Sequence, residues 1–189
     1  MVDWNLPVDH PTQPHIVQLA GILCDDDDAC SIIKQFQTII KPDGWEIQEE
    51  AARIHGISRD YAWKFGEKID DAFKAFNKLI AQADGSGDGR LIGHNVTFDI
   101  RMMLREYSTL PVHDHIPINN LLPFCTMKSM TNVCRIPHPT RRSGYKWPKL
   151  MEAYYYCFNA EFPNVHTALG DTLACRDIFV HGRRQGWWR

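Results

Sequence analysis

The alternation of apolar and polar positions predicts two strands near the start of the chain. Residues 16–24 are apolar and β-prone, residues 25–28 form a polar turn, and residues 31–40 alternate well enough for a second strand. Together these segments predict an antiparallel hairpin. Residues 1–14 hold three prolines and show little periodicity, so we expect an irregular N-terminal segment there.

Apolar positions three and four residues apart predict helices in the rest of the chain, and the clearest one covers residues 69–83 with a single apolar stripe. Gly56 is placed to end a shorter helix, and Pro148 suits the first turn of another. The remaining expected helices cover residues 47–54, 96–107, 126–133, 148–158 and 167–181, and two short strands cover 90–93 and 121–125. A hairpin followed by alternating helices and strands predicts one α/β domain with a mixed sheet, over residues 15–189.

Composition sets limits on function. The chain has 189 residues, of which 44% are hydrophobic and 23% charged, as in an ordinary globular domain. Its formal net charge of −2 gives no global basic field, so any contact with nucleic acid must be local. The six cysteines show no C-x-x-C pair, which argues against a zinc knuckle or disulfide framework and favours a reducing, cytoplasmic location. No apolar run or N-terminal signal pattern predicts a membrane location.

Two short segments far apart in the sequence carry a candidate metal site. The first sets Asp99 on the opening turn of a helix that follows an apolar strand. The second sets His166 on a loop and Asp171 in the next helix. Each residue has a plainer interpretation as a helix-start acid or a loop histidine. Taken together, a histidine beside converging carboxylates is what metal-assisted hydrolysis of a phosphodiester needs.

These segments also carry a family resemblance. The string Gly93-His94-Asn95-Val96-Thr97-Phe98-Asp99 resembles the second motif of the DEDDh 3′–5′ exonucleases, the epsilon-subunit type of proofreading enzyme. The segment from His166 to Asp171 resembles their third motif, histidine-x-x-x-x-aspartate. Further similar strings lie at residues 14–20, 54–57, 125–127 and 146–150, so the resemblance covers roughly residues 14–181. It implies a ribonuclease-H-like fold, a mixed five-stranded sheet flanked by helices.

The resemblance implies hydrolysis of terminal phosphodiesters of DNA to nucleoside monophosphates, with two Mg²⁺ or Mn²⁺ ions between carboxylates. One ion would activate a water and the other would stabilise the leaving 3′-oxygen. By position, Asp99 and Asp171 would be catalytic metal ligands. His166 would be the general base, a task that suits the near-neutral pKa of histidine.

The resemblance also implies the partners. Asn95 and Phe98 would position the terminal nucleotide, and His94 would either contact it or serve only in core packing. The expected partner is the 3′ end of single-stranded DNA. A 3′–5′ exoribonuclease, or a non-catalytic module that binds nucleic acid or a polymerase, remains the alternative function.

The family's first motif, a strand that ends in Asp-x-Glu and supplies two more carboxylates, has no counterpart here. Before Ile16 the chain offers Asp3 and Asp9 but no strand, and its first glutamates follow the hairpin. The absent strand would lie in the middle of the sheet, between the hairpin and residues 90–93. The chain is therefore a truncated form of a complete enzyme, a relative without catalysis, or one in which Asp3 or Asp9 replaces the lost ligands. We expect the first, because without the central strand two neighbouring strands each lose a hydrogen-bonding edge, a loss comparable to a typical folding stability. The third is the least expected, because a loop holds metal ligands poorly.

Residues 135–149 contain five basic residues, no acidic ones, and two aromatic side chains, Tyr145 and Trp147. Such a stretch could follow a single-stranded backbone while an aromatic ring stacks on a base. Alternatively, Trp147 packs in the core and the arginines are merely solvated. The acidic turn at 25–28 lacks the spaced ligands of a calcium loop and is interpreted as a solvated hairpin turn. The glycine-rich segment 85–89 follows a helix and precedes a strand, the opposite order to a phosphate loop. The histidines at 113 and 115 lie in a proline-bounded segment that is interpreted as a surface loop.

Overall fold

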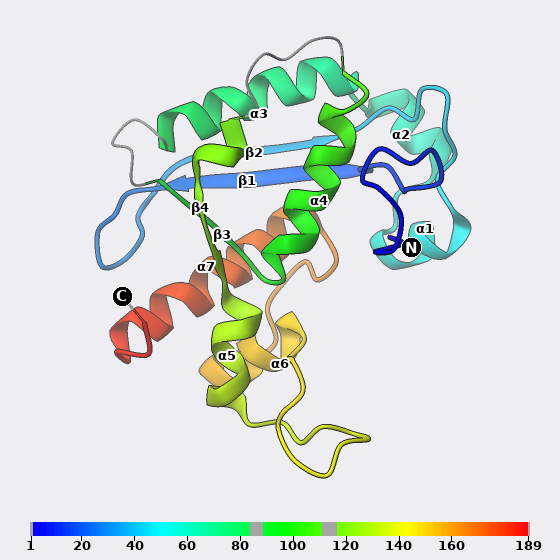
Figure 1. Ribbon diagram of the computed structural model, residues 1–189. Helices are drawn as coiled ribbons and strands as arrows, with labels where there is room; N and C mark the ends of the chain where they lie inside the picture. Colours follow the sequence, from blue (N-terminus) through cyan, green and yellow to red (C-terminus); the bar gives the residue numbers. More distant parts are fainter. Residues whose placement is uncertain (1, 84–88, 111–116, 189) are drawn as a thin grey trace.

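The computed structural model describes residues 2–83, 89–110 and 117–188 (Figure 1). Strands β1 (Gln18–Cys24) and β2 (Ile32–Ile39) form an antiparallel hairpin, and β3 (Arg90–Gly93) pairs in parallel with β4 (Leu122–Cys125). The helices are α1 (Glu49–His55), α2 (Arg59–Phe65), α3 (Ile69–Ala83), α4 (Val96–Tyr107), α5 (Thr126–Cys134), α6 (Leu150–Phe158) and α7 (Ala168–Arg184), with a 3-10 turn, η1, at Pro117–Asn120.

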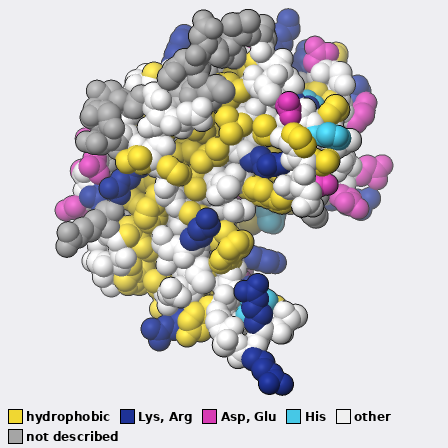
Figure 2. Space-filling view, in the orientation of Figure 1, with side chains coloured by type: hydrophobic (Ala, Val, Ile, Leu, Met, Phe, Trp, Pro, Cys, Tyr) yellow, Lys and Arg dark blue, Asp and Glu magenta, His cyan; other side chains and the backbone are white. Residues whose placement is uncertain are grey.

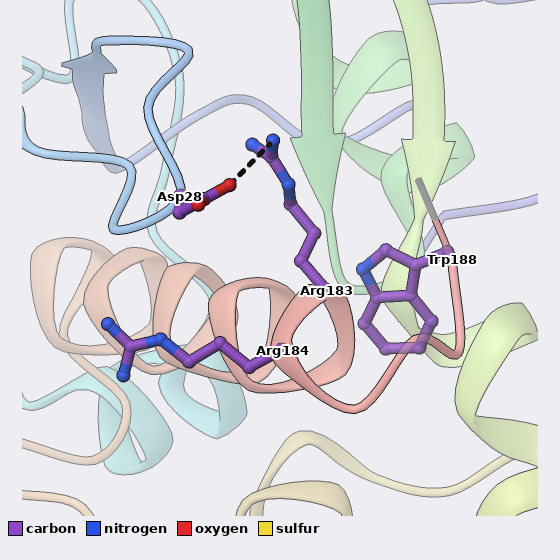
Figure 3. A pocket seen from close by; sticks show the side chains of 4 residues that line it. All are labelled: Asp28, Arg183, Arg184 and Trp188. Atoms are coloured by element: carbon purple, nitrogen blue, oxygen red, sulfur yellow. Dashed lines mark ion pairs between the residues drawn. The ribbon is translucent and has the colours of Figure 1, made fainter.

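The hairpin forms as expected, and its acidic turn is closed by its own hydrogen bonds. The Asp27 carboxylate accepts the Ser31 hydroxyl at 2.6 Å and the Ser31 amide at 2.8 Å, and these bonds lower the pKa of Asp27. Arg183 reaches from the end of α7 to Asp26 at 3.2 Å and Asp28 at 3.8 Å. Figure 3 shows the Arg183 guanidinium group directed at Asp28 in a pocket that Arg184 and Trp188 also line. The acidic turn at residues 25–28 is therefore exposed, and Arg183 pairs with two of its carboxylates.

The hairpin is covered by α3 on one side and α7 on the other (Figure 1). The apolar stripe of α3 is buried as predicted, with Ala72 and Phe73 fully inaccessible. Gly21 of β1 permits the close approach of α3, because a Cβ there would lie 2.7 Å from the Phe76 ring. A second part of the core lies between α5, α6 and α7, at Met130, Ala153 and Ile178. Helices α5 and α6 form a lobe that projects from the body of the molecule.

The four strands of the described part of the chain form two separate pairs. There, β1 pairs only with β2, and β3 only with β4. Each of β1 and β3 therefore presents one edge of unpaired backbone groups. The division lies between the hairpin and residues 90–93, where the sequence predicts the absent strand. The mixed α/β architecture agrees with the expected fold class.

Several boundaries differ from the prediction for local reasons. The sequence pattern does not predict helix α2, because this helix buries only Ala62 and so has no apolar stripe, although Ser58 caps it by accepting the Tyr61 amide. Helix α6 begins at Leu150, so Pro148 precedes the helix instead of filling its first turn. Helix α7 continues three residues beyond His181. Residues 84–88 and 111–116 lie outside the described part, and so do the expected loops there.

All six cysteines are free, as the absence of a disulfide framework in the sequence predicts. No helix in the described residues has the length and apolar character needed to cross a membrane.

Candidate active site

The turn between β3 and α4 carries the segment from Gly93 to Asp99, which resembles the second motif of the family. Asn95 adopts a left-handed conformation with φ of 75°, which asparagine tolerates better than most residues. Its carbonyl oxygen accepts the Phe98 amide at 2.7 Å, while its side chain makes no capping bond to α4. Phe98 is 39% exposed. The turn thus leaves the Asn95 amide and the Phe98 ring accessible to a ligand.

Asp99 lies on the first turn of α4 and forms no ion pair with a described residue. Its side chain is exposed by surface area. The protein atoms packed around the carboxyl group nevertheless desolvate it, and they raise its pKa to about 7 against a smaller opposing effect of its own backbone amide. An exposed, poorly solvated and unpaired carboxyl group is suited to a cationic ligand.

The loop before α7 and the first turn of this helix carry the other motif segment, from His166 to Asp171. Thr167 caps the helix by accepting the Gly170 amide at 3.1 Å. His166 precedes it with φ of 67°, a strained conformation, and donates its backbone N–H to Asp171 Oδ1 at 3.3 Å. Burial raises the pKa of Asp171, and the His166 amide and ring charge oppose that effect. The loop therefore holds His166 beside the Asp171 carboxyl group.

A chain of hydrogen bonds connects the turn before α4 to α5 and α7. His94 Nε2 donates to the Pro148 carbonyl oxygen at 2.9 Å, and its Nδ1 lies 3.0 Å from the Thr126 hydroxyl. That hydroxyl is also 3.4 Å from Cys175 Sγ. Burial lowers the pKa of His94 and raises that of Cys175 to about 12, so His94 stays neutral and the thiol stays protonated. His94 Nδ1 can then accept the Thr126 hydroxyl hydrogen, for which the Gly93 carbonyl oxygen at 3.3 Å is a second acceptor.

Cys175 relates the two aspartates electrostatically and by sequence spacing. Burial is the main cause that raises the pKa of Cys175, and the Asp99 charge adds a smaller effect in the same direction. Cys175 follows Asp171 by one helical turn, and residues four apart share a face. The start of β1 also joins the site, because Gln18 Oε1 accepts the Ala168 amide at 2.7 Å.

Thr126→Val is expected to lower the free energy of unfolding by about 1–3 kcal/mol, because it leaves His94 Nδ1 and the Cys175 thiol without a buried partner. Urea unfolding followed by circular dichroism measures this. Thr131→Val on the same helix is the control, since among the described residues its hydroxyl donates only to the Met127 carbonyl oxygen, at 2.9 Å, and its loss leaves no second side chain unpaired. Equal losses in the two variants would contradict a connecting role for Thr126.

The described residues do not complete a site for two metal ions. Asp99 and Asp171 supply hard oxygen ligands of the kind that Mg²⁺ and Mn²⁺ prefer. However, no group of three or more His, Cys, Asp or Glu side chains in the described ranges is arranged to hold a metal ion. The residues present therefore fit part of a divalent-ion site, and additional ligands are needed.

Some residues of the site carry little or no signal in the sequence. Thr126 belongs to a string that is similar to the family, but its bond to His94 cannot be foreseen from that string. Cys175 carries one usable signal, its spacing of four residues from Asp171. Gln18 carries none. Both ring nitrogens of His94 are bonded within the protein, so His94 supports the site and has no ring nitrogen left for a ligand.

Known exonucleases are similar to this chain in sequence and in fold. A family model described as an exonuclease, RNase T, matches residues 8–179. A structure of exonuclease I is 18% identical with a TM-score of 0.68 and covers 89% of this chain and 37% of its own. E. coli exonuclease I in complex with a 5cy-dT13 oligonucleotide is also 18% identical, with a TM-score of 0.62, and covers 89% of this chain and 36% of its own. No curated protein matches by sequence. The chain thus spans about a third of exonuclease I and shares its fold.

Proposed function

Because the chain belongs to the RNase T exonuclease family, we propose that it hydrolyses terminal phosphodiesters at the 3′ end of DNA and releases nucleoside monophosphates. The observation that carries the proposal is the placement of Asp99 and Asp171 in the first turns of α4 and α7, where burial raises the pKa of both carboxyl groups. Neither carboxylate has an ion-pair partner in the described residues. A pair of free carboxylates beside a histidine suits phosphodiester hydrolysis.

Each remaining site residue receives a role from its position. His166, on the loop beside Asp171, takes a proton from the attacking water. Asn95 offers an uncommitted amide to the terminal nucleotide, and Phe98 offers an exposed apolar ring. His94 positions the end of β3 through Thr126 and Pro148, because both of its ring nitrogens are already bonded.

The remaining ligands would come from one further strand. The unpaired edges of β1 and β3 can each accept backbone hydrogen bonds, and both strands contact α7, which carries Asp171. A strand between them that ends in Asp-x-Glu would bring two carboxylates towards Asp99 and Asp171. Asp3 and Asp9 are poorer candidates, because Asp3 accepts the Asn5 amide within an irregular segment and neither residue belongs to a strand.

DNA is the preferred substrate because the solved relative holds a dT13 oligonucleotide. A 3′–5′ exoribonuclease remains the second candidate on the resemblance alone. The epsilon-subunit subtype and a polymerase partner also rest on that resemblance, since the structural relatives are exonuclease I.

The proposal is tested with 5′-labelled and 3′-labelled single strands of DNA and RNA, incubated with Mg²⁺ or Mn²⁺. We expect stepwise shortening of the 5′-labelled DNA and immediate release of label from the 3′-labelled DNA. The chain is assayed both alone and with an added Asp-x-Glu strand. Shortening from the 5′ end, or internal cuts, would contradict the proposed polarity.

His166→Ala is expected to reduce that cleavage about 100-fold, the lower end of the range for a general base, because His166 is exposed and solvent can accept some of the protons. Single-turnover rates at neutral pH measure the loss. His10→Ala, in the irregular N-terminal segment, is the control and should leave the rate unchanged. An undiminished rate in His166→Ala would remove the residue from the mechanism.

A further inference from the structure

The segment between α5 and α6, residues 135–149, forms a projecting, ordered loop with a basic tip (Figures 1 and 2). Pro137 and Tyr145 form an antiparallel bridge, and the Lys146 amide donates to the Ile136 carbonyl oxygen at 2.9 Å. Gly144 takes φ of 88° at the return of the chain. The loop is therefore a closed hairpin-like excursion that presents its side chains from a defined backbone.

The aromatic residues of this loop lie on its exposed side. Side chains alternate along an extended chain, so Tyr145 and Trp147 point one way and Lys146 the other. The exposures agree, since Trp147 is 61% exposed and Tyr145 is 41% exposed. Lys146 instead reaches Glu152 Oε2 at 2.7 Å. The interpretation in which Trp147 packs in the core is therefore wrong.

Two positive charges of the loop are also without an ion pair among the described residues. Arg141 and Arg142 lie at the exposed tip and form no ion pair with a described residue. The loop itself contains no acidic residue, and the nearest acid on α6, Glu152, is committed to Lys146. Two uncommitted guanidinium groups in the same loop as two exposed rings match a ligand that carries both anionic and flat aromatic groups.

The loop is attached directly to the candidate active site. Trp147 precedes Pro148, whose carbonyl oxygen accepts His94 Nε2 at 2.9 Å. His94 in turn lies one residue beyond β3 and four residues before Phe98, at the start of the helix that carries Asp99. A strand whose end lies at Asp99 and Asp171 could therefore continue across this loop.

We infer that residues 135–149 are a binding platform for single-stranded nucleic acid, with Trp147 and Tyr145 stacking on bases and Arg141 and Arg142 neutralising phosphates. The inference rests on the proposed function in taking a single strand as the partner. It adds a second contact region, which holds the strand away from the reacting end. Base stacking on an aromatic ring tolerates any sequence, so the platform would bind without strong sequence preference.

Binding is measured by fluorescence anisotropy of labelled dT and mixed-sequence oligonucleotides with the 189-residue chain in EDTA, where no cleavage occurs. Trp147→Ala is expected to weaken binding about 5- to 150-fold, and Trp147→Phe to restore part of the loss. Trp63→Ala is the control, because Trp63 is similarly exposed at 47% but lies on α2 beneath Lys41. Circular dichroism confirms that each variant is folded.

The combined Arg141→Ala and Arg142→Ala change should reduce the salt dependence of binding, by about 0.7 in the log–log slope for each phosphate that is no longer neutralised. Lys74→Ala with Lys78→Ala on α3 removes the same charge elsewhere and should bind like the unchanged chain at matched salt. The inference is wrong if the chain binds no single strand, or if the Trp147 and arginine variants bind as tightly as their controls. If binding behaves as expected but no cleavage occurs with the added strand, the platform stands and the proposed function fails.

Discussion

Adding an Asp-x-Glu strand to this chain is expected to raise its exonuclease rate by about 1,000-fold or more. Without that strand, the 189 residues should cleave single-stranded DNA slowly or not at all, because the described residues provide only two of the carboxylates that two ions require. Two-ion stabilisation of the attacking and leaving oxygens contributes several kcal/mol, and each 1.36 kcal/mol changes the rate about tenfold. The strand is supplied as an N-terminal extension of about 10–15 residues, enough for one strand and its turn.

The added strand should also stabilise the fold, through a separate effect. It pairs with the open edges of β1 and β3, and each internal hydrogen bond contributes about 0.5–1.5 kcal/mol. An extension carrying Asn-x-Gln is the matched control, since it forms the same backbone bonds without carboxylates. Both extensions should raise the midpoint of thermal unfolding, and only Asp-x-Glu should restore cleavage. A fully active chain without extension, or equal activity of the two extensions, would contradict the proposed strand.

Regular helices with one apolar face were predictable from the sequence. The bounds of α3 and α4 agree with the prediction at both ends, because each has periodic apolar positions and a clear stop. The elements that carry the two motif segments were predictable as well, since the motif residues follow β3 and open α7. Helix α2 was not, because its side chains are mostly exposed and its formation depends on the Ser58 cap.

Contacts between distant segments explain what the sequence could not provide. Glu106 is 1% exposed and accepts the Ile16 amide at 2.7 Å, so a charged residue of α4 fixes the chain before β1. Nothing in the sequence near residue 106 indicates a burial of this kind. The bond between Thr126 and Cys175 likewise joins residues that are 49 positions apart. Such partners depend on how helices pack, which local periodicity does not encode.

Asp99→Asn tests the electrostatics of the site in the 189-residue chain, in EDTA. The pKa of Asp99 is raised to about 7 in the folded chain, against about 3.9 when unfolded, so folding favours the protonated form. Its contribution to stability is therefore complete below about pH 4 and is lost as the pH rises to about 7. Because the side chain is exposed and solvent screens the charge, we expect a loss of about 1–2 kcal/mol. Asparagine removes this loss, so the variant should equal the unchanged chain at about pH 4 and exceed it at about pH 8.

Urea unfolding at about pH 4, 6 and 8 measures the difference in free energy of unfolding between Asp99→Asn and the unchanged chain. The control is Asp60→Asn, which changes an exposed first-turn aspartate of α2 and should show no such pH-dependent gain. In the chain with the Asp-x-Glu strand, the same Asp99→Asn change should reduce cleavage by about 1,000-fold or more, since it removes a proposed metal ligand. Greater stability together with lost cleavage is what a carboxylate held for a cation predicts, because the poor solvation of its charge opposes folding until the cation binds. Retained cleavage in Asp99→Asn would place the reacting centre elsewhere, and loss of both stability and cleavage would give Asp99 a structural role instead.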